Sequence, residues 1–409
     1  MENLVSNSPV INQNPSSINT LVNSVGLNAI NNRSDVLQIQ NYLKTLGYPV
    51  AASGSISNNQ TDSTIISILN FQANNRIQVT GNINPDDVTY NALKQLNSTN
   101  TSLVEAEDES LHQPFLTNSF LFRRNAGNTN TLNVIFEGDS WLDYPVPTIL
   151  DLYDTITDRN QRLNLNCLHL AKFGETTSQM YADRTHFVQY VSGYRIDRIY
   201  FSGGGNDVFP QLGRILNSGI TSFDPSFFTD QAKLTELRSL SGDALYQKCI
   251  LYKRYLNTAA FDRALFNSVN LGSIFSTIMR NYLGFGSIVN AHATPNTIFY
   301  MHTYDYPLFK LGVRPSIVGV DLPLGPWIKP VFDRLGIADE ILRSYIIIRL
   351  LDKFYALLWQ IKNHFTYYGY RFQSRIIDYR GLLNSSEFWR DEIHPNSAGA
   401  RRLSTRVTF

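Results

Sequence analysis

Five short runs of β-branched and aromatic residues, separated by longer helical segments, follow Thr131. Helices are expected near residues 147–157, 175–192, 258–283 and 338–365. Strands that alternate with helices in this way predict an α/β domain with a parallel sheet between layers of helices. Such sheets bind ligands at the carboxyl ends of their strands, so functional residues are expected there. The strand candidates are LNVIFEG, LNLNCLHLA, IDRIYFSGG, NTIFYMHTY and FQSRIIDYR.

The chain is too long for one ordinary domain, because 409 residues usually divide into two or three domains. Hydrophobic residues make up 43% of the chain and charged residues 17%, which is enough apolar material for well-formed cores. The 35 Lys and Arg residues balance 34 Asp and Glu residues, for a formal net charge of +1. This balance provides no basic field for a phosphate backbone, so no nucleic acid is expected as a partner.

The most apolar stretch covers residues 345–361. Arg349, Asp352 and Lys353 lie within it at helical spacing, and these charges would be costly in lipid. We therefore expect a packed helix and no integral membrane segment.

The N-terminal sequence MENLVSNSPVINQNPSS lacks the basic and apolar segments of a secretory signal. We expect an extracytoplasmic or secreted protein whose export route uses no recognisable signal peptide.

Three regions precede the α/β domain of residues 131–409. Residues 1–33 are rich in Asn and Ser without a sustained period, which predicts a flexible arm. Residues 34–97 carry three amphipathic patterns and predict a small three-helix domain. Residues 98–130 are rich in Ser, Thr and Asn and predict a linker.

The first predicted helix begins at a cap on Ser34 or Asp35 and stops at Gly47. Its apolar face is formed by Val36, Ile39, Leu43 and Leu46. The second helix carries Ile65, Ile66, Leu69 and Phe71, and the third runs from Asp86 through Val88, Tyr90, Leu93 and Leu96.

Gly138-Asp139-Ser140-Trp141 directly follows the first strand candidate, so Ser140 lies in the turn at the carboxyl end of a predicted strand. A serine hydroxyl becomes a nucleophile only when an imidazole removes its proton, and a carboxylate must orient that imidazole. Asp391 precedes His394 by three residues near the C-terminus, within Asp-Glu-Ile-His-Pro. This spacing allows the carboxylate to reach Nδ1 while Nε2 faces Ser140. The predicted catalytic residues are therefore Ser140, Asp391 and His394.

An oxyanion requires hydrogen-bond donors, and two further turns offer them. Asn206 lies in SGGGND after the third strand candidate, where its amide can donate to an oxyanion. Gly174 follows the second strand candidate, and its backbone N–H is expected to point into the same hole as that of Ser140. The predicted oxyanion hole comprises Ser140, Gly174 and Asn206.

Two aromatic residues are weaker candidates for substrate contact. Trp141 adjoins the nucleophile, and His302 ends the fourth strand candidate without an acid three residues before it. For His302, substrate contact and packing both remain open. Asp139 and Asp207 are expected to organise turns near the site. No His, Cys and carboxylate set has zinc spacing, so neither a metal nor another cofactor is expected.

Two features outside the motifs admit alternative structures. Cys167 and Cys249 are predicted to be buried thiols, with a disulfide as the alternative. Residues 207–258 are extra to the alternation of strands and helices and are candidates for a cover over the site. Their aromatic residues fit either a lid or a core; these are Phe223, Phe227 and Phe228.

Gly-Asp-Ser, an isolated Gly, Gly-x-Asn-Asp and Asp-x-x-His occur here in the order typical of SGNH (GDSL-like) hydrolases. Residues 131–409 resemble this family, with Ser140, Gly174, Asn206 and His394 at its four characteristic positions. The resemblance implies a flavodoxin-like three-layer α/β/α fold and ester hydrolysis through an acyl-enzyme. The first motif ends in Trp141 where the family commonly has Leu.

Residues 34–97 resemble the peptidoglycan-binding type 1 domain, through VLQIQNYLKTLGY and ILNFQANNRIQVTGNINPDDVTYNALKQL. Between these segments SGSISNNQTD replaces the turn that is usual in the family. The resemblance implies a peptidoglycan partner, and a helical spacer or docking module without glycan affinity is the alternative.

Three functions follow from these observations. The first is a serine esterase directed to the cell wall, which removes acetyl or similar groups from peptidoglycan or another esterified glycan. The second is a lipolytic esterase or a lysophospholipase-type effector, in which the helical domain only directs delivery. The third is a non-catalytic component of a secretion or phage-like assembly, against which the intact set of four motifs argues.

Overall fold

A computed structural model of the chain describes residues 21–46, 48, 50, 52–57, 62–74, 77–78, 80–102, 115–144, 150–314, 316–317, 320–321 and 325–409. The chain forms two compact units, Met1–Glu109 and Ser110–Phe409. Each unit has its own hydrophobic core, so the two are described separately.

The first unit contains the three predicted helices, α1 (Arg33–Thr45), α2 (Ser63–Asn74) and α3 (Val88–Ser102). Their apolar faces meet in a core that includes Val36, Ile39, Leu43, Ile65, Phe71, Tyr90 and Leu93. The predicted first helix face is therefore buried as expected, whereas its predicted stop at Gly47 lies outside the described residues.

The prediction of a flexible arm over residues 1–33 was wrong for its described part. Strand β1 (Val25–Gly26) pairs antiparallel with β2 (Asn82–Ile83), and Val25 is buried. Asp35 is not the helix cap, because α1 begins after Asn32. Its carboxylate instead accepts hydrogen bonds from the backbone N–H groups of Val22 and Asn23, both at 3.1 Å. Residues 21–32 therefore belong to the helical unit.

Two buried glutamines hold the turns of the first unit. Gln40 on α1 accepts from the N–H of Gly54 at 2.8 Å and donates to the carbonyl oxygen of Ser55 at 2.8 Å. Gln72 on α2 accepts from the N–H of Gly81 at 2.8 Å and donates to the carbonyl oxygen of Asn82 at 2.8 Å. These bonds satisfy the buried side-chain amides of Gln40 and Gln72.

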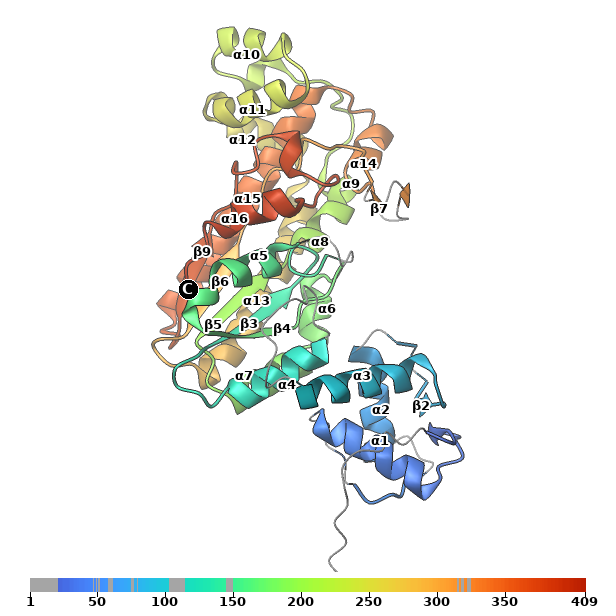
Figure 1. The fold of residues 1–409 in the computed structure, drawn as a ribbon. Helices are drawn as coiled ribbons and strands as arrows, with labels where there is room; N and C mark the ends of the chain where they lie inside the picture. Colours follow the sequence, from blue (N-terminus) through green and yellow to red (C-terminus); the bar gives the residue numbers. More distant parts are fainter. Residues whose placement is uncertain are drawn as a thin grey trace, which may run out of the picture. The chain divides into compact units, whose positions relative to one another are not determined.

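The second unit is built on a five-stranded parallel sheet in the order β4-β3-β5-β6-β9 (Figure 1). All five strand predictions are confirmed, and every neighbouring pair runs parallel. This order is that of flavodoxin-like folds, as predicted. The bounds are β3 (Leu132–Gly138), β4 (Leu165–His169), β5 (Arg198–Ser202), β6 (Ile298–His302) and β9 (Gln373–Ile377).

Aromatic side chains that alternate along the strands attach a helical layer to each face of the sheet. On one face Phe136 contacts Tyr153 of α5 (Leu152–Arg159) and the C-terminal Phe409. On the other face Phe201 contacts Phe285 of α13 (Ser268–His292), and Phe299 contacts Phe365 of α15 (Glu340–Tyr367). The three-layer α/β/α fold follows from this period of two residues.

The remaining helices complete the two layers and the insertions (Figure 1). The helix predicted at 175–192 is divided into α6 and α7, and the helix predicted at 258–283 is divided into α12 and α13. The bounds are α4 (Phe115–Asn125), α6 (Thr177–Ala182), α7 (Thr185–Gly193), α8 (Gly205–Val208), α9 (Leu212–Ile215), α10 (Gln231–Arg238), α11 (Gly242–Tyr252), α12 (Thr258–Leu265), α14 (Lys329–Arg334) and α16 (Ser397–Ser404). A small hairpin joins β7 (Ser316–Ile317) to β8 (Val320–Asp321).

Part of the predicted linker belongs to this unit. Helix α4 lies within residues 98–130 and buries Phe122 against Tyr190 of α7. The insertion at 207–258 also enlarges the fold, because α11 packs on α15. Phe223 and Phe228 contact Tyr345 of α15, so the aromatic residues of this insertion form core and not a lid.

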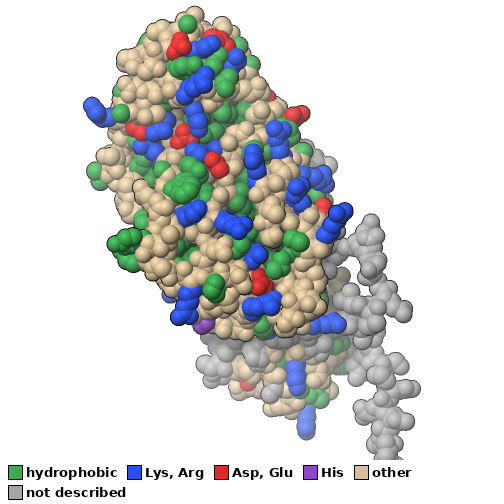
Figure 2. Space-filling view, turned by 90° about the vertical axis from the view of Figure 1, so that its left-hand side faces the viewer, with side chains coloured by type: hydrophobic (Ala, Val, Ile, Leu, Met, Phe, Trp, Pro, Cys, Tyr) green, Lys and Arg blue, Asp and Glu red, His purple; other side chains and the backbone are tan. Residues whose placement is uncertain are grey.

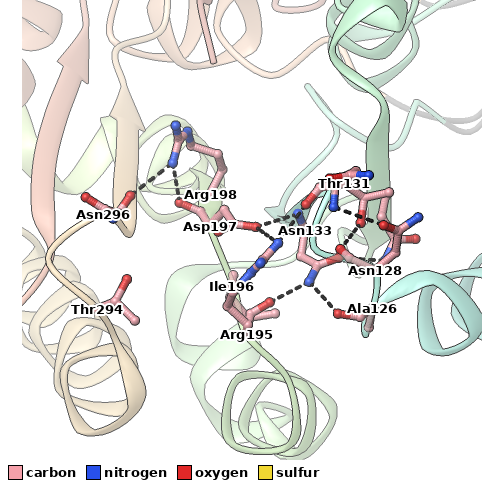
Figure 3. Close-up of polar contacts among 12 residues, drawn as sticks. Ala126, Asn128, Thr131, Asn133, Arg195, Ile196, Asp197, Arg198, Thr294 and Asn296 are labelled. Atoms are coloured by element: carbon pink, nitrogen blue, oxygen red, sulfur yellow. Dashed lines mark hydrogen bonds and ion pairs between the residues drawn. The ribbon is translucent and has the colours of Figure 1, made fainter.

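A polar network fixes the amino-terminal ends of the strands (Figure 3). The side-chain amide of Asn133 donates to the carbonyl oxygens of Ala126 at 3.0 Å and Arg195 at 2.7 Å. The carboxylate of Asp197 accepts from the N–H of Asn133 at 2.9 Å, and Arg195 donates to the carbonyl oxygen of Thr131 at 2.7 Å. Because these bonds hold the segments that enter β3 and β5, the opposite ends of the two strands are brought into register.

The surface of the structure carries mixed side chains. Figure 2 shows Lys and Arg side chains dispersed over one face, among hydrophobic side chains and a few Asp and Glu. Within the described part of the chain, no helix combines the length and the hydrophobicity needed to cross a bilayer.

Candidate active site

The nucleophile turn begins where β3 ends beside β5. Gly138 pairs with Ser202, and a Cβ at position 138 would lie 2.4 Å from the carbonyl oxygen of Ser202. Only glycine therefore permits this approach. The turn that follows is closed by a hydrogen bond from the N–H of Leu142 to the carbonyl oxygen of Asp139 at 2.9 Å. Ser140 lies at its tip, at the carboxyl edge of the sheet.

The side chain of Asp139 holds this turn through hydrogen bonds. Its buried carboxylate accepts from the hydroxyl of Ser202 at 2.8 Å, from the N–H of Trp141 at 3.2 Å and from the hydroxyl of Tyr304. Burial raises the pKa of Asp139 to about 6, although the bonds from Tyr304 and Ser202 oppose that shift. The carboxylate therefore supports the backbone of the turn, and it makes no hydrogen bond to the imidazole of His394 among the described contacts.

Ser140, His394 and Asp391 form one connected chain of hydrogen bonds. Nε2 of His394 lies 2.8 Å from Oγ of Ser140, and its Nδ1 lies 2.9 Å from each carboxylate oxygen of Asp391. All three residues are buried. Since the carboxylate can only accept, Nδ1 carries the proton and Nε2 is free to accept the serine proton. The structure thus brings together the three residues that the sequence predicts as catalytic.

The Asp391 carboxylate is also held by its own turn. It accepts from the N–H groups of Ile393 at 3.0 Å and His394 at 2.9 Å, and from the hydroxyl of Tyr144 at 3.1 Å. Burial raises its pKa, but the neighbouring imidazole and these N–H groups together keep the pKa of Asp391 below its ordinary value. The residue is therefore ionised at neutral pH and fixes the imidazole orientation.

Gly174 and Asn206 lie in turns connected to the nucleophile turn. The N–H of Lys172 donates to the carbonyl oxygen of Gly138 at 2.9 Å, and the amide of Asn206 donates to the carbonyl oxygen of Glu175 at 3.0 Å. Gly174 is exposed with a φ of +79°, which favours glycine. Within the described ranges, the backbone N–H groups of Ser140 and Gly174 donate to no other protein atom. Two unused N–H donors and one side-chain amide therefore lie in turns that hydrogen bonds connect to the nucleophile turn.

Asp207 holds the turn that contains Asn206. Its carboxylate accepts from the N–H and the hydroxyl of Thr177 at the start of α6, both at 2.9 Å. Burial raises the pKa of Asp207, while the bonds from Thr177 lower it. This contact joins the third motif to the helix that follows Gly174, as the turn-organising role of Asp207 requires.

The two weaker substrate candidates differ in position. Trp141 is largely buried, and its indole N–H donates to the carbonyl oxygen of Ile393 at 3.2 Å. Trp141 nevertheless lines a small hollow beside Ser140. His302 is completely buried, and its ring stacks between those of Trp141 and Tyr200. Substrate contact by His302 is therefore ruled out in this structure, and packing is its role.

The burial of His302 predicts a pH-dependent stability. Burial lowers its pKa to about 4, whereas an exposed histidine titrates near 6.5. As the pH falls from 6.5 to 4, His302 is protonated in the unfolded chain but stays neutral in the folded chain. The free energy of unfolding therefore decreases over that pH range. The loss is on the order of 3 kcal/mol. His302→Phe keeps a ring and cannot be protonated, so its free energy of unfolding in urea should rise relative to wild type between pH 7 and pH 4.5.

The control for this prediction is Tyr379→Phe, which changes the same stack of rings without removing a group that titrates in this range. Its difference from wild type should be equal at both pH values. If the His302→Phe difference is also constant, His302 does not resist protonation.

Several residues of the site escape sequence motifs. Tyr144 donates to Asp391 and lines the hollow beside Ser140, and Tyr304 donates to Asp139. Phe173 and Trp327 lie against the imidazole of His394, with ring centroids at 6.1 Å and 5.3 Å. The position of Phe173, directly before Gly174, was a usable signal, whereas Trp327 and Tyr304 are close to the site only through the fold.

The two cysteines are free thiols, and Cys249 is completely buried. The disulfide alternative is therefore wrong. Across the described ranges, His, Cys, Asp and Glu side chains form no group of three that could hold a metal ion.

Residues 32–93 match the family model described as "Putative peptidoglycan binding domain". The resemblance indicated by the sequence for residues 34–97 is therefore confirmed. No curated protein matches the chain. A peptidoglycan-binding-like domain is thus followed by a domain with the three-layer α/β/α fold.

Solved structures with similarity to the chain include two lipolytic proteins and one carbohydrate esterase. The lipase Lip_vut3 from a goat rumen metagenome is 15% identical, with 67% of this chain and 95% of that chain covered and a TM-score of 0.37. A lipolytic protein of the G-D-S-L family from Veillonella parvula is 10% identical, with 67% and 95% covered and a TM-score of 0.31. A carbohydrate esterase family 3 protein from Talaromyces cellulolyticus is 12% identical, with 67% and 93% covered and a TM-score of 0.30.

Proposed function

We propose that the chain is a serine esterase that removes short acyl groups, acetyl above all, from peptidoglycan or a similar glycan. The observation that carries this proposal is the contact of 2.8 Å between Oγ of Ser140 and Nε2 of His394, whose Nδ1 is held by Asp391. This arrangement is the requirement for a serine nucleophile. A non-catalytic component of an assembly would not require this arrangement.

In the proposed reaction, Oγ of Ser140 attacks the ester carbonyl carbon while Nε2 of His394 takes the hydroxyl proton. The carbonyl oxygen becomes an oxyanion, and the N–H groups of Ser140 and Gly174 and the amide of Asn206 stabilise it. The carbon–oxygen bond to the alcohol then breaks, and His394 returns the proton to the departing alkoxide. Water, deprotonated by His394, attacks the acyl-enzyme, and the carboxylic acid leaves as Ser140 regains its proton.

The small hollow beside the catalytic pair favours a short acyl group. It is lined by Trp141, Tyr144, Leu150, Asp151 and Pro395. In the proposed function an acetyl group occupies this hollow, and a long fatty acyl chain would extend beyond it.

The helical unit supports a wall-directed role. Its match to a peptidoglycan binding domain suggests that it holds the esterase near glycan strands, at a cell-wall-associated and extracytoplasmic location. In this arrangement the first unit supplies proximity and the second unit supplies chemistry.

The test compares two substrates. The full chain should release acetate from O-acetylated peptidoglycan sacculi faster than it releases fatty acid from phospholipid vesicles, because the hollow suits the smaller acyl group. Acetate is measured enzymatically and fatty acid by chromatography. The opposite preference would replace this proposal by the lipolytic one.

A second arm uses residues 110–409, the second compact unit. Its turnover of p-nitrophenyl acetate should match that of the full chain, because all site residues lie in this unit. Its release of acetate from sacculi should fall, and it should no longer sediment with them. Sedimentation of the isolated first unit at several salt concentrations excludes simple charge attraction. If the first unit stays in the supernatant, a spacer role replaces wall binding.

A further inference from the structure

The residue between the acid and the base of the site has its own set of contacts. Glu392 is completely buried, and its carboxylate accepts from four backbone N–H groups. The donors are Gly312 at 3.2 Å, Ile328 at 2.7 Å, Lys329 at 2.6 Å and Trp327. Burial raises the pKa of Glu392, and the four backbone N–H groups oppose that shift by donating to the carboxylate. Glu392 therefore anchors the segment that leads into α14.

This anchor places an aromatic ring against the general base. Trp327 is half-buried, and its ring lies edge-to-face on the imidazole of His394, with centroids 5.3 Å apart and planes at 81°. The Asp391-Glu392-Ile393-His394 turn thus positions the imidazole through its first residue and the indole through its second. A rearrangement of the turn would move both rings together.

The chemistry of ester cleavage indicates what this indole meets. Nε2 of His394 must protonate the departing alkoxide, so the alcohol portion of the ester lies beside the imidazole. A half-exposed indole in contact with the same imidazole is then a wall for that alcohol. Phe173, also half-buried, lies 6.1 Å from the imidazole and adds a second ring. Aromatic rings offer extended apolar area to the C–H faces of a sugar.

We propose that Trp327 is a specificity-determining residue that stacks on a pyranose in the alcohol position of the ester, and that Glu392 is the positioning residue that holds it there. This inference rests on the proposed esterase function and deepens it by assigning the alcohol to a sugar. In this proposal the acyl group occupies the hollow beside Ser140, so the preference concerns the alcohol alone.

The experiment uses two acetates with different alcohols, the 6-O-acetyl ester of methyl N-acetylglucosaminide and ethyl acetate. The full chain should prefer the sugar ester in kcat/KM. Trp327→Ala should lower the ratio of the two kcat/KM values about tenfold, mainly through KM for the sugar ester, because a stacked ring contributes on the order of one power of ten in affinity. Trp327→Phe should recover part of the ratio. Trp359→Ala removes an exposed tryptophan on α15 and should change kcat/KM for neither acetate.

Glu392→Gln tests the anchor. In this variant an NH₂ group, which is a donor, replaces one carboxylate oxygen that accepts from backbone N–H groups. The segment around Trp327 is then no longer held, so the variant should lose the preference for the sugar ester as Trp327→Ala does. The double variant should lose no more than either single variant, since both changes remove one contact. Circular dichroism and the melting temperature of each variant report on its folding. Independent and additive losses would overturn the role of Glu392.

Two outcomes separate this inference from the proposed function. An equal loss for both acetates in Trp327→Ala, or no loss, would overturn the sugar-stacking role while leaving the esterase intact. If the wild-type chain hydrolyses neither acetate, the esterase function is overturned. The stacking role of Trp327 is then tested by sugar binding alone. Quenching of tryptophan fluorescence by the N-acetylglucosamine tetramer should persist in Trp359→Ala and disappear in Trp327→Ala. Equal quenching in both variants would overturn the assignment.

Discussion

Ser140→Ala is expected to lower kcat on p-nitrophenyl acetate by about 10⁴-fold or more, because removal of a serine nucleophile leaves only binding and oxyanion stabilisation. Ser140 provides the Oγ atom 2.8 Å from the imidazole, and alanine leaves that position empty. The measurement is initial-rate kinetics on purified full-length protein. Wild-type turnover in this variant, with an unchanged circular dichroism spectrum, would contradict the assignment.

His394→Ala provides the internal comparison. Loss of the base should be about as damaging as loss of the nucleophile, and the double variant should be hardly worse, because residues that act as a unit are not additive. His302→Ala should retain measurable activity, since His302 is buried in a stack of rings and has no carboxylate partner among the described residues. If His302→Ala were the more damaging of the two, the base would have been assigned to the wrong histidine.

Asn206→Ala carries the second large effect, a decrease in kcat of about 100-fold with a smaller change in KM. The physical reason is that the amide donates to an oxygen that becomes negative only in the transition state. The bond from Asn206 to the carbonyl oxygen of Glu175 uses one amide hydrogen and leaves the other for the substrate. Steady-state kinetics on p-nitrophenyl acetate separate the two parameters.

A matched control exists elsewhere in the same unit. Asn217 also donates through Nδ2 to a backbone carbonyl oxygen, that of Ala264 at 2.9 Å, and it is not part of the site. Asn217→Ala should therefore leave kcat unchanged while it removes the same kind of bond. An Asn206→Ala effect confined to KM would mean that Asn206 binds substrate in its ground state.

The strands and the site motifs could be predicted because their signals are local. Each strand candidate is a short run that contains β-branched and aromatic residues, and the carboxyl ends of parallel strands necessarily share one edge. Ser140, Gly174 and Asn206 follow the three adjacent strands β3, β4 and β5, so the topology alone brings them together. Asp391 and His394 are three residues apart, and their contact depends only on one turn.

The break between α12 and α13 was missed although its signal is local, because Asn267 caps α13 by accepting from the N–H of Asn270 at 3.0 Å. Other features depend on distant partners and have no local signal. The arm at residues 21–32 reads as polar and irregular, yet Val25 is buried because it pairs with Ile83, 58 positions later in the chain. Glu392 resembles a surface residue between two catalytic ones until the segment around Trp327 is placed against it.

The glutamines of the first unit have a consequence for how its loops can change. Gln40 and Gln72 grip the main chain of their turns, through Gly54 and Ser55 in one and Gly81 and Asn82 in the other. These hydrogen bonds depend on the path of the main chain and little on the identity of most side chains in the turns. Substitutions at exposed residues of either turn should therefore leave the spacing of the helices unchanged. The same property makes these two turns suitable places to graft foreign recognition sequences.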